Sequence, residues 1–390
     1  MKKILLLIIP ALLIVAALVF SHFSSLLIME ETTMPYTNDY EIPDSIPEYQ
    51  VISTNEKTDW TAKWIWDKEN LTEKNIWMCF NKKVSLDKIP EELIAHISAD
   101  SKYWLYINGE AVVFEGSVKR GPDENSGYYD SIDIAPYLKE GENSICALVW
   151  FWGDQKNYSY NSSGQGGFIF EAKNDDINII SDRNWKVKKH SAYEDKLFNQ
   201  PNYRLPEHSI YFDARNDLGD WINKDFDVSS WENATEYGVG GEGVYDGKLY
   251  PRGIPFVKDY GLKDYENSKD YENYTVKNLF GEKITVDIPY NAQVTTYLKV
   301  IAPAGKKIRI ITENTPIGAV STTYITKEGE QEFEALGWVN GEHITYDIPH
   351  GVTVVALKYR ETGYDSSFAG NFKCDDEFLN SLWQKSLRTL

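Results

Sequence analysis

The residues best suited to chemistry form an aromatic and polar run at the end of an apolar stretch. Trp150 and Trp152 are followed by Asp154 and Tyr158, and the run leads into the Gly/Ser-rich segment SYNSSGQGG. The apolar faces of sugars stack on aromatic rings, while carboxylate and amide groups accept hydrogen bonds from sugar hydroxyls. The run therefore predicts a carbohydrate platform. The alternative is that Trp150 and Trp152 plug the end of a β-sandwich and contact the next domain.

Asp213 and Arg215 form a second charged motif, separated by a single alanine. They follow a short apolar run, so their spacing favours an ion pair at the edge of a strand. A second interpretation depends on the family resemblance described below.

Metal and nucleophile chemistry finds little support in the sequence. Cys79, Cys146 and Cys374 are too few and too scattered for a zinc site, and we expect them to be buried thiols. A disulfide between Cys79 and Cys146 is the alternative. His343 and His350 are separated by an odd interval, which places them on opposite faces of a strand. We predict no catalytic residue, no metal ligand and no cofactor in this chain.

The charge balance excludes one class of partner. The chain carries 40 Lys and Arg against 59 Asp and Glu, a net charge of −19, which repels phosphate backbones and anionic lipids. We therefore expect no nucleic-acid partner.

Residues 1–30 begin Met-Lys-Lys and continue with a long apolar run. This pattern predicts a signal peptide or a retained membrane anchor, because a second apolar patch at residues 26–29 extends the segment toward spanning length. We expect an exported protein that is periplasmic, extracellular or anchored to the membrane by its N-terminus.

The elements that position these residues are predicted to be strands. From residue 60 onward, short runs rich in β-branched and aromatic residues alternate with Gly, Asn, Asp and Pro turns. Asn108–Gly109 is a strong signal for a two-residue hairpin between runs 105–107 and 112–114. The predicted fold class is all-β: a jelly-roll-like β-sandwich, a second smaller β-sandwich, and then a helix.

Changes in composition suggest the domain boundaries. Residues 31–59 are polar and rich in proline, which is typical of a linker. We place the first sandwich at 60–245, a Tyr-rich charged linker at 246–274 and the second sandwich at 275–370.

Residues 371–390 have a different pattern. Apolar residues recur at helical spacing behind Asp375 and Asp376, which suit the start of a helix. The apolar face still repeats at Leu390, and a lone amphipathic helix of this length is marginal without a partner. We expect this helix to be the first of a larger helical domain that the chain lacks.

Several segments together resemble the bacterial α-L-rhamnosidases of glycoside hydrolase family 78. The more specific ones are FDAR at 212–215 with Trp221 and Trp231, LYPRGIP at 249–255, YRETGY at 359–364, GNF at 370–372 and LNSLWQKS at 379–386. Weaker matches are ISAD at 97–100, LYING at 105–109, YYD at 128–130 and GEN at 141–143. The resemblance covers about residues 60–390.

The resemblance implies inverting hydrolysis of terminal α-L-rhamnose by acidic residues on an (α/α)6 barrel. The family's acidic motifs lie after the point where this chain stops, so none is carried over. Some similar domains hold a calcium-linked rhamnose site near the motif of Asp213 and Arg215. They often carry Gly-Glu just ahead of it, whereas here residues 209–212 are Ser-Ile-Tyr-Phe. This departure favours the ion pair and leaves calcium without support.

Three functions therefore remain open from the sequence. The first is a non-catalytic N-terminal portion of an α-L-rhamnosidase-like enzyme, working with a missing or separately encoded catalytic domain on rhamnose-containing glycans. The second is a free-standing exported carbohydrate-binding protein, and the third is an anchored spacer.

Overall fold

The computed structural model describes residues 59–389 except 119, 155, 158–159, 197–206, 241, 246–247, 316–319 and 365–369. The predicted signal or anchor at 1–30 and almost all of the predicted linker at 31–59 lie outside the described residues. Within the described part of the chain, no helix is long and apolar enough to cross a bilayer.

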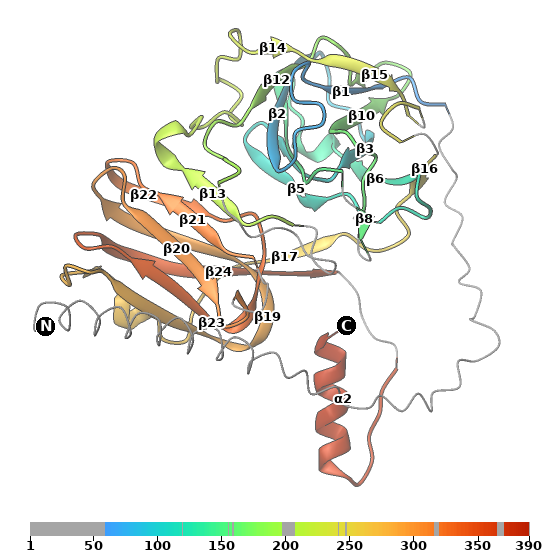
Figure 1. The fold of residues 1–390 in the computed structure, drawn as a ribbon. Helices are drawn as coiled ribbons and strands as arrows, with labels where there is room; N and C mark the ends of the chain where they lie inside the picture. The colour runs from blue at the N-terminus through green and yellow to red at the C-terminus, as the bar shows by residue number, and fades with distance from the viewer. Residues whose placement is uncertain are drawn as a thin grey trace, which may run out of the picture. The chain divides into compact units, whose positions relative to one another are not determined.

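Two sheets form the first sandwich (Figure 1). The first sheet has the order β15 (Thr235–Val239), β1 (Lys63–Trp66), β10 (Gly167–Lys173), β3 (Ile94–Asp100), β6 (Gly127–Asp133) and β16 (Leu249–Pro251), with β11 (Asn178–Ile180) beside β10. The second sheet has the order β14 (Glu232–Asn233), β12 (Lys186–Lys189), β2 (Ile76–Leu86), β7 (Gly141–Phe151), β4 (Lys102–Ile107) and β5 (Glu110–Gly116). β8 (Lys156–Asn157) pairs antiparallel with β9 (Tyr160–Asn161), and η1 (Ala135–Tyr137) follows β6.

A third sheet of nine strands builds the second sandwich. Its order is β13 (Ile210–Asp213), β21 (Thr322–Ile325), β20 (Lys307–Thr312), β23 (Val339–Ile348), β19 (Glu282–Ala302), β24 (Thr353–Tyr364) and β17 (Val257–Asp264). β18 (Tyr274–Thr275) pairs with β24, and β22 (Gly329–Glu334) pairs with β19. The predicted all-β class with two successive sandwiches is confirmed.

The predicted hairpin at Asn108–Gly109 is confirmed. β4 and β5 pair antiparallel, with Ile107 opposite Glu110. Asn108 and Gly109 have φ angles of 53° and 84°, the left-handed conformations that a tight two-residue turn of this kind requires. The local dipeptide therefore fixes the register of this edge of the second sheet.

The second sheet is buried on both of its faces. Along β7, Ile145, Ala147 and Val149 point into the core between the first two sheets. Cys146 and Leu148 point the other way, into a second core that includes side chains of the third sheet. Because successive strand residues alternate between faces, burial of both faces explains the unbroken apolar run at 145–152.

Residues 246–274, which the sequence suggests as a linker, contain paired strands. β16 pairs parallel with β6 of the first sandwich, and β17 pairs antiparallel with β24 of the second. A 3-10 turn, η3 (Ser268–Tyr271), follows β17. β13 also differs from its expected place, because it lies within 60–245 but pairs parallel with β21 of the third sheet. The chain therefore passes between the sandwiches more than once.

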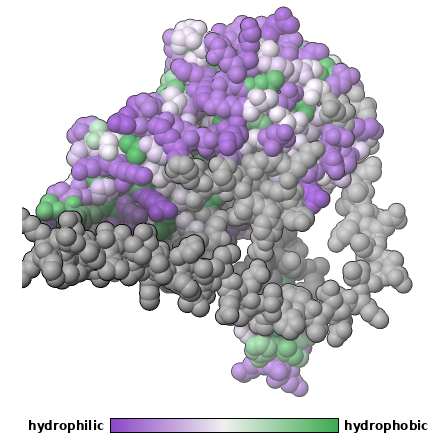
Figure 2. Space-filling view, in the orientation of Figure 1, coloured by the Kyte–Doolittle hydropathy of each residue, from purple (hydrophilic) through white to green (hydrophobic). Residues whose placement is uncertain are grey.

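The predicted helix near the C-terminal end is present as α2 (Glu377–Thr389). The Asp376 carboxylate accepts hydrogen bonds from the backbone N–H groups of Phe378 and Leu379, at 2.8 and 3.3 Å, and so caps the helix as expected. Phe378 is 72% exposed, and Leu382 is 48% exposed. Figure 2 shows hydrophobic surface on this segment.

Candidate functional site

Trp150 and Trp152, the centre of the predicted carbohydrate platform, are fully buried. The Trp150 ring stacks on Trp77 with centroids 4.4 Å apart, and Trp77 stacks in turn on Tyr193 at 4.0 Å. Trp150 Nε1 donates to the Asn75 side-chain oxygen at 2.9 Å. Because protein rings cover these faces, no sugar can stack on them in this structure. The alternative interpretation, in which both rings plug the sandwich end against the next domain, matches the geometry.

A buried charged cluster lies where the second sheet contacts the third, a region that we call the junction. Lys102 of β4 forms an ion pair with Glu115 of β5, and its Nζ lies 4.5 Å from the centre of the Trp338 ring. Trp338 precedes β23 of the third sheet, and its Nε1 donates to Glu115 Oε1 at 2.6 Å. Glu207 lies 3.9 Å from the ammonium group. These contacts tie the second sheet to the third through one buried cation.

The remaining residues of the predicted platform divide between the surface and the undescribed part. Asp154 is exposed, and Tyr158 lies outside the described residues. The Gly/Ser-rich loop that follows is held by Asp100, which accepts from Ser162 Oγ at 3.1 Å and from the Ser163 N–H at 2.7 Å. Burial raises the pKa of Asp100, and hydrogen bonds from Tyr160, Ser163 and Ser101 oppose the rise. The loop is therefore organised by a structural carboxylate.

Asp213 and Arg215 form the predicted ion pair. Asp213 ends β13, and Arg215 lies in the short turn η2 (Ala214–Asn216). Arg215 Nε and Nη2 donate to the two carboxylate oxygens of Asp213 at 2.9 and 2.6 Å. These bonds lower the pKa of Asp213. The Arg215 side chain is 53% exposed, so this pair lies at a surface while the tryptophans lie in the buried junction.

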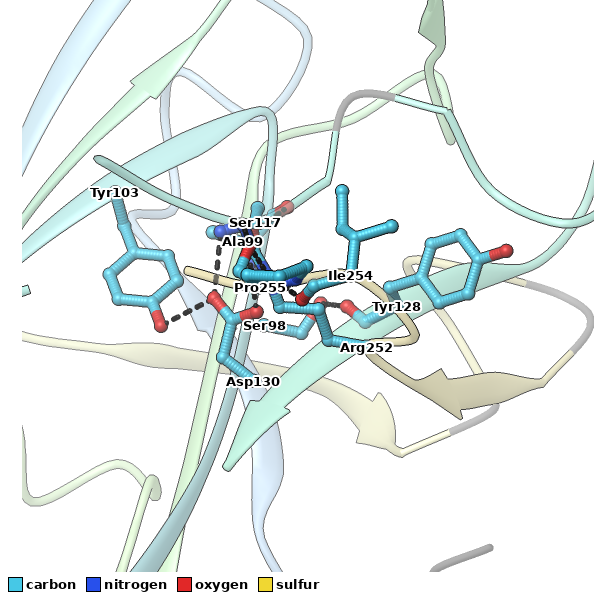
Figure 3. Close-up of polar contacts among 9 residues, drawn as sticks. All are labelled: Ser98, Ala99, Tyr103, Ser117, Tyr128, Asp130, Arg252, Ile254 and Pro255. Carbon is cyan, nitrogen blue, oxygen red and sulfur yellow. Dashed lines mark hydrogen bonds and ion pairs between the residues drawn. The ribbon is translucent and has the colours of Figure 1, made fainter. Parts of the chain in front are cut away.

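A buried cluster that the sequence did not reveal lies around Asp130 (Figure 3). Arg252, which follows β16, donates from Nη1 to Asp130 Oδ1 at 3.0 Å. The other carboxylate oxygen accepts from Tyr103 Oη and from the Ser117 N–H, both at 2.8 Å. Both charged side chains are at most 5% exposed. All three donors hold Asp130 as a buried carboxylate.

The Arg252 guanidinium also organises the segment that leaves the first sandwich. Its Nε donates to the Ile254 carbonyl at 3.1 Å, and its Nη2 donates to the Pro255 carbonyl at 3.1 Å. The Phe256 ring lies 4.7 Å from the guanidinium carbon. The backbone carbonyls of the Pro-Arg-Gly-Ile-Pro motif therefore accept hydrogen bonds from the motif's own arginine. This is a structural role for part of the LYPRGIP segment.

Among the described residues, no group of three or more His, Cys, Asp or Glu is placed to hold a metal ion. Cys79, Cys146 and Cys374 are free thiols, so the alternative of a disulfide is not seen. Burial raises the pKa of Cys79 well above its usual value and that of Cys146 to about 11. Both thiols therefore stay protonated and unreactive near neutral pH.

Comparisons with known proteins point to the same family as the sequence motifs. No family model matches the chain. A curated α-L-rhamnosidase from Formosa agariphila is 24% identical over 346 residues, which covers 80% of this chain and 34% of that protein. The chain thus spans about a third of the length of this curated relative.

Two solved structures share the fold. The family 78 rhamnosidase of Bacillus sp. GL1 has a TM-score of 0.69 and 16% identity, covering 85% of this chain and 58% of that chain. An α-L-rhamnosidase from Aspergillus terreus has a TM-score of 0.63 and 18% identity, covering 84% and 39%. The predicted resemblance to α-L-rhamnosidases is confirmed.

Proposed function

We propose that the described residues are the non-catalytic sandwich region of an α-L-rhamnosidase-like glycoside hydrolase that acts on terminal α-L-rhamnose of glycans. The observation that carries this proposal is the match to a curated α-L-rhamnosidase over 80% of the chain, joined to the shared fold. The rhamnose-containing substrate belongs to the whole enzyme and to its catalytic domain, which is encoded with this chain or separately.

The exposed face of α2 supports the proposal. Phe378, Leu379 and Leu382 are 72%, 42% and 48% exposed, an unusual density of large apolar groups for a single short helix. A helix of 13 residues gains most of its stability from packing its apolar face. A helical catalytic domain would supply that packing.

The buried carboxylates of the sandwiches support a structural role. An inverting glycosidase uses one carboxylic acid to protonate the leaving oxygen and one carboxylate to activate water. Here Asp130 is held by Arg252, Tyr103 and Ser117, and Glu115 is held by Lys102 and Trp338. Carboxylates engaged in this way hold strands together, and protein donors occupy the oxygens that a sugar would need.

The test compares the recombinant chain with the native protein. We expect the purified 390-residue chain to leave an aryl α-L-rhamnoside intact. An antibody raised against the chain should precipitate, from the cells that produce it, material that releases L-rhamnose from the same substrate. An unrelated aryl β-D-glucoside controls for contaminating hydrolases.

The opposite result is equally specific. A precipitate that contains no polypeptide larger than 44.8 kDa and hydrolyses no rhamnoside would overturn the enzyme proposal. It would favour the free-standing carbohydrate-binding protein instead. Hydrolysis by the recombinant chain alone would also contradict the proposal, because it would place the catalytic residues within these 390 positions.

We also propose that the protein is exported, on the pattern of residues 1–30. Cell fractionation with the same antibody tests this. Signal in the periplasm, the medium or the membrane fraction is expected, and signal confined to the cytoplasm would contradict it.

A further inference from the structure

Lys102 and Glu115 meet inside the junction, where water is excluded. Their side chains are 3% and 6% exposed, and they form a direct ion pair. The ammonium group lies 4.5, 5.6 and 5.9 Å from the ring centres of Trp338, Trp152 and Trp104. These rings replace the water that would surround such a pair at a surface. Because the pair is closed to solvent, the partners available to each group are the other members of the cluster.

The backbone is strained at Glu115. This residue has a φ of 77°, in the left-handed region that non-glycine residues rarely adopt. The register of β4 and β5 also shifts between Tyr103 and Leu105, so the hairpin is irregular at this end. Strain of this kind persists only where the surrounding structure enforces it, and it gathers at functional sites. The fold therefore accepts strain at the residue that contacts Lys102.

Two neighbours are placed to assist a reaction between the pair. Trp338 Nε1 donates to Glu115 Oε1 at 2.6 Å, so it stabilises negative charge that develops on this oxygen. Glu207 is 3% exposed, and its carboxylate lies 3.9 Å from Lys102 Nζ. A shift of about 1 Å brings these atoms within hydrogen-bond reach, so Glu207 can take a proton from the nitrogen and return it. The cluster thus holds a nucleophile, an electrophile, an oxyanion donor and a proton carrier.

We propose that Lys102 and Glu115 join in an intramolecular isopeptide bond, a modification that forms within the folded chain. The ion pair described above is the state before the reaction. A proton first passes from Lys102 Nζ to Glu115 Oε2, which leaves a neutral amine beside a neutral carboxylic acid. Burial favours this exchange, because both charged groups have lost their hydration.

The bond change conserves atoms and needs no co-reactant. Lys102 Nζ attacks Glu115 Cδ, and the electron pair of the C=O bond moves to Oε1, which accepts from Trp338 Nε1. Glu207 takes one proton from the nitrogen and gives it to Glu115 Oε2. The bond between Cδ and Oε2 then breaks and water leaves, while the C=O bond to Oε1 re-forms as part of an amide. Glu207 ends in the state in which it began.

Two features favour the amide over the ion pair. Well-oriented intramolecular reactions reach effective concentrations of roughly 10⁵–10⁸ M, and Lys102 and Glu115 are already in contact. The product also replaces two buried charges by one neutral amide, whose carbonyl keeps the hydrogen bond from Trp338. The bond would close the β4–β5 hairpin covalently at the edge of the second sheet. This modification goes beyond the proposed function and does not rest on it, because it uses only residues of the junction.

The test is tryptic peptide mapping by mass spectrometry of the full chain, purified in its folded state and incubated at neutral pH. Trypsin cuts after lysine, so the unmodified chain gives separate peptides of residues 89–102 and 103–119. An isopeptide bond blocks cleavage at Lys102. We therefore expect a single peptide of residues 89–119, lighter than its sequence by the mass of one water molecule. Fragmentation should place the link between Lys102 and Glu115.

A surface pair in the same digest is the matched control. Lys263 Nζ lies 2.5 Å from Glu361 Oε2, but these side chains are 38% and 21% exposed. Their peptides should keep unmodified masses, because water solvates both charges. A chain that is kept in urea from cell lysis onward should gain no further linked peptide during incubation, because the contact between Lys102 and Glu115 exists only in the fold.

Two variants separate this reaction from a purely structural ion pair. Lys102→Arg removes the nucleophile and should restore the two separate peptides. Glu207→Gln keeps the ion pair but removes the proton carrier, and it should slow formation of the linked peptide at least about tenfold. A linked peptide that forms as fast in Glu207→Gln would overturn the role of Glu207.

The unmodified chain decides the proposal even where a variant fails to fold. Absence of the linked peptide after incubation of the folded chain would overturn it, as would a link from Lys102 to a residue other than Glu115. Rhamnoside hydrolysis by the native precipitate is a separate readout, so failure of this modification and failure of the proposed enzyme role are distinguishable.

Discussion

Two aspartate–arginine pairs of this chain have the same chemistry and opposite settings. Asp130 and Arg252 are 122 residues apart in the sequence, and their side chains are 0% and 5% exposed. Asp213 and Arg215 are neighbours in one turn, and the arginine is 53% exposed. The distant pair joins segments that would otherwise separate, whereas the local pair shapes a single turn.

This difference shows that hydrogen-bond distance alone does not predict which pair contributes more to stability. Asp213 has the shorter contact with its arginine, 2.6 Å against 3.0 Å for Asp130. Water can replace the exposed arginine, but it cannot reach Asp130 without disrupting strand packing. Removing one partner of a buried pair leaves an uncompensated charge, which costs far more than losing a surface contact.

The largest expected effect comes from Arg252→Met. It leaves Asp130 buried with two of its three donors, and we expect the free energy of unfolding to fall by about 3–5 kcal/mol. Urea denaturation measures this. The double variant Asp130→Asn, Arg252→Met removes both charges and should recover part of the loss. A loss below about 1 kcal/mol for Arg252→Met would show that the buried pair contributes no more to stability than the exposed pair.

The same contrast between buried and exposed groups extends to two histidines and gives the next largest effect. The pKa of His190 falls to about 4 in the folded state, below its usual 6.5, so the unfolded chain binds the proton first. The contribution of neutral His190 to the free energy of unfolding is fully present above pH 6.5. It is lost as the pH falls toward 4, and the loss amounts to roughly 3 kcal/mol. His190→Gln should remove that part of the pH dependence of unfolding.

His343 provides the control for this titration. Its pKa is raised by the hydrogen bond to Asp287, so any contribution is present at low pH and is lost as the pH rises. His343 is exposed, and His343→Gln should change the profile little. A His190→Gln profile that matches the unmodified chain between pH 4 and 6.5 would contradict the assignment.

An intermediate effect is expected at the junction cluster, from Trp338→Phe. Phenylalanine keeps a ring near Lys102 but loses the N–H bond to Glu115. Because Glu115 is buried and charged, we expect a loss of about 2 kcal/mol in urea denaturation. Equal stability of the variant and the unmodified chain would show that the indole N–H does not hold the two sheets together.

The smallest effect is expected for Arg215→Ala. The arginine is half exposed, so its pair with Asp213 should contribute at most about 1 kcal/mol, and less in high salt. Thermal unfolding at low and high ionic strength measures this. A loss above about 2 kcal/mol would mean that the local pair is as important as the distant one.

Local signals in the sequence predicted local structure well. Asn108–Gly109 predicted a hairpin, and Asp376 predicted a helix start, because each acts through backbone groups a few residues away. The pairing of β13 with β21 joins segments more than 100 residues apart, and no local pattern encodes it. The Asp130–Arg252 pair was missed for the same reason.

The burial of the tryptophans had a signal that the platform hypothesis did not use. The run from Ile145 to Trp152 is apolar without interruption, which is typical of a strand covered on both faces. An exposed platform would have been expected to interrupt the run with polar residues. The domain boundaries and the export signal stay predictions.

The two covered faces of the second sheet limit how this region can be rearranged. A chimera that divides the chain near residue 246 would expose Trp77, Trp104 and Leu148 to water on one fragment, and Tyr324 and Phe333 on the other. Both fragments would be prone to aggregation. In recombination, natural or engineered, the pair of sandwiches should be inherited as one module.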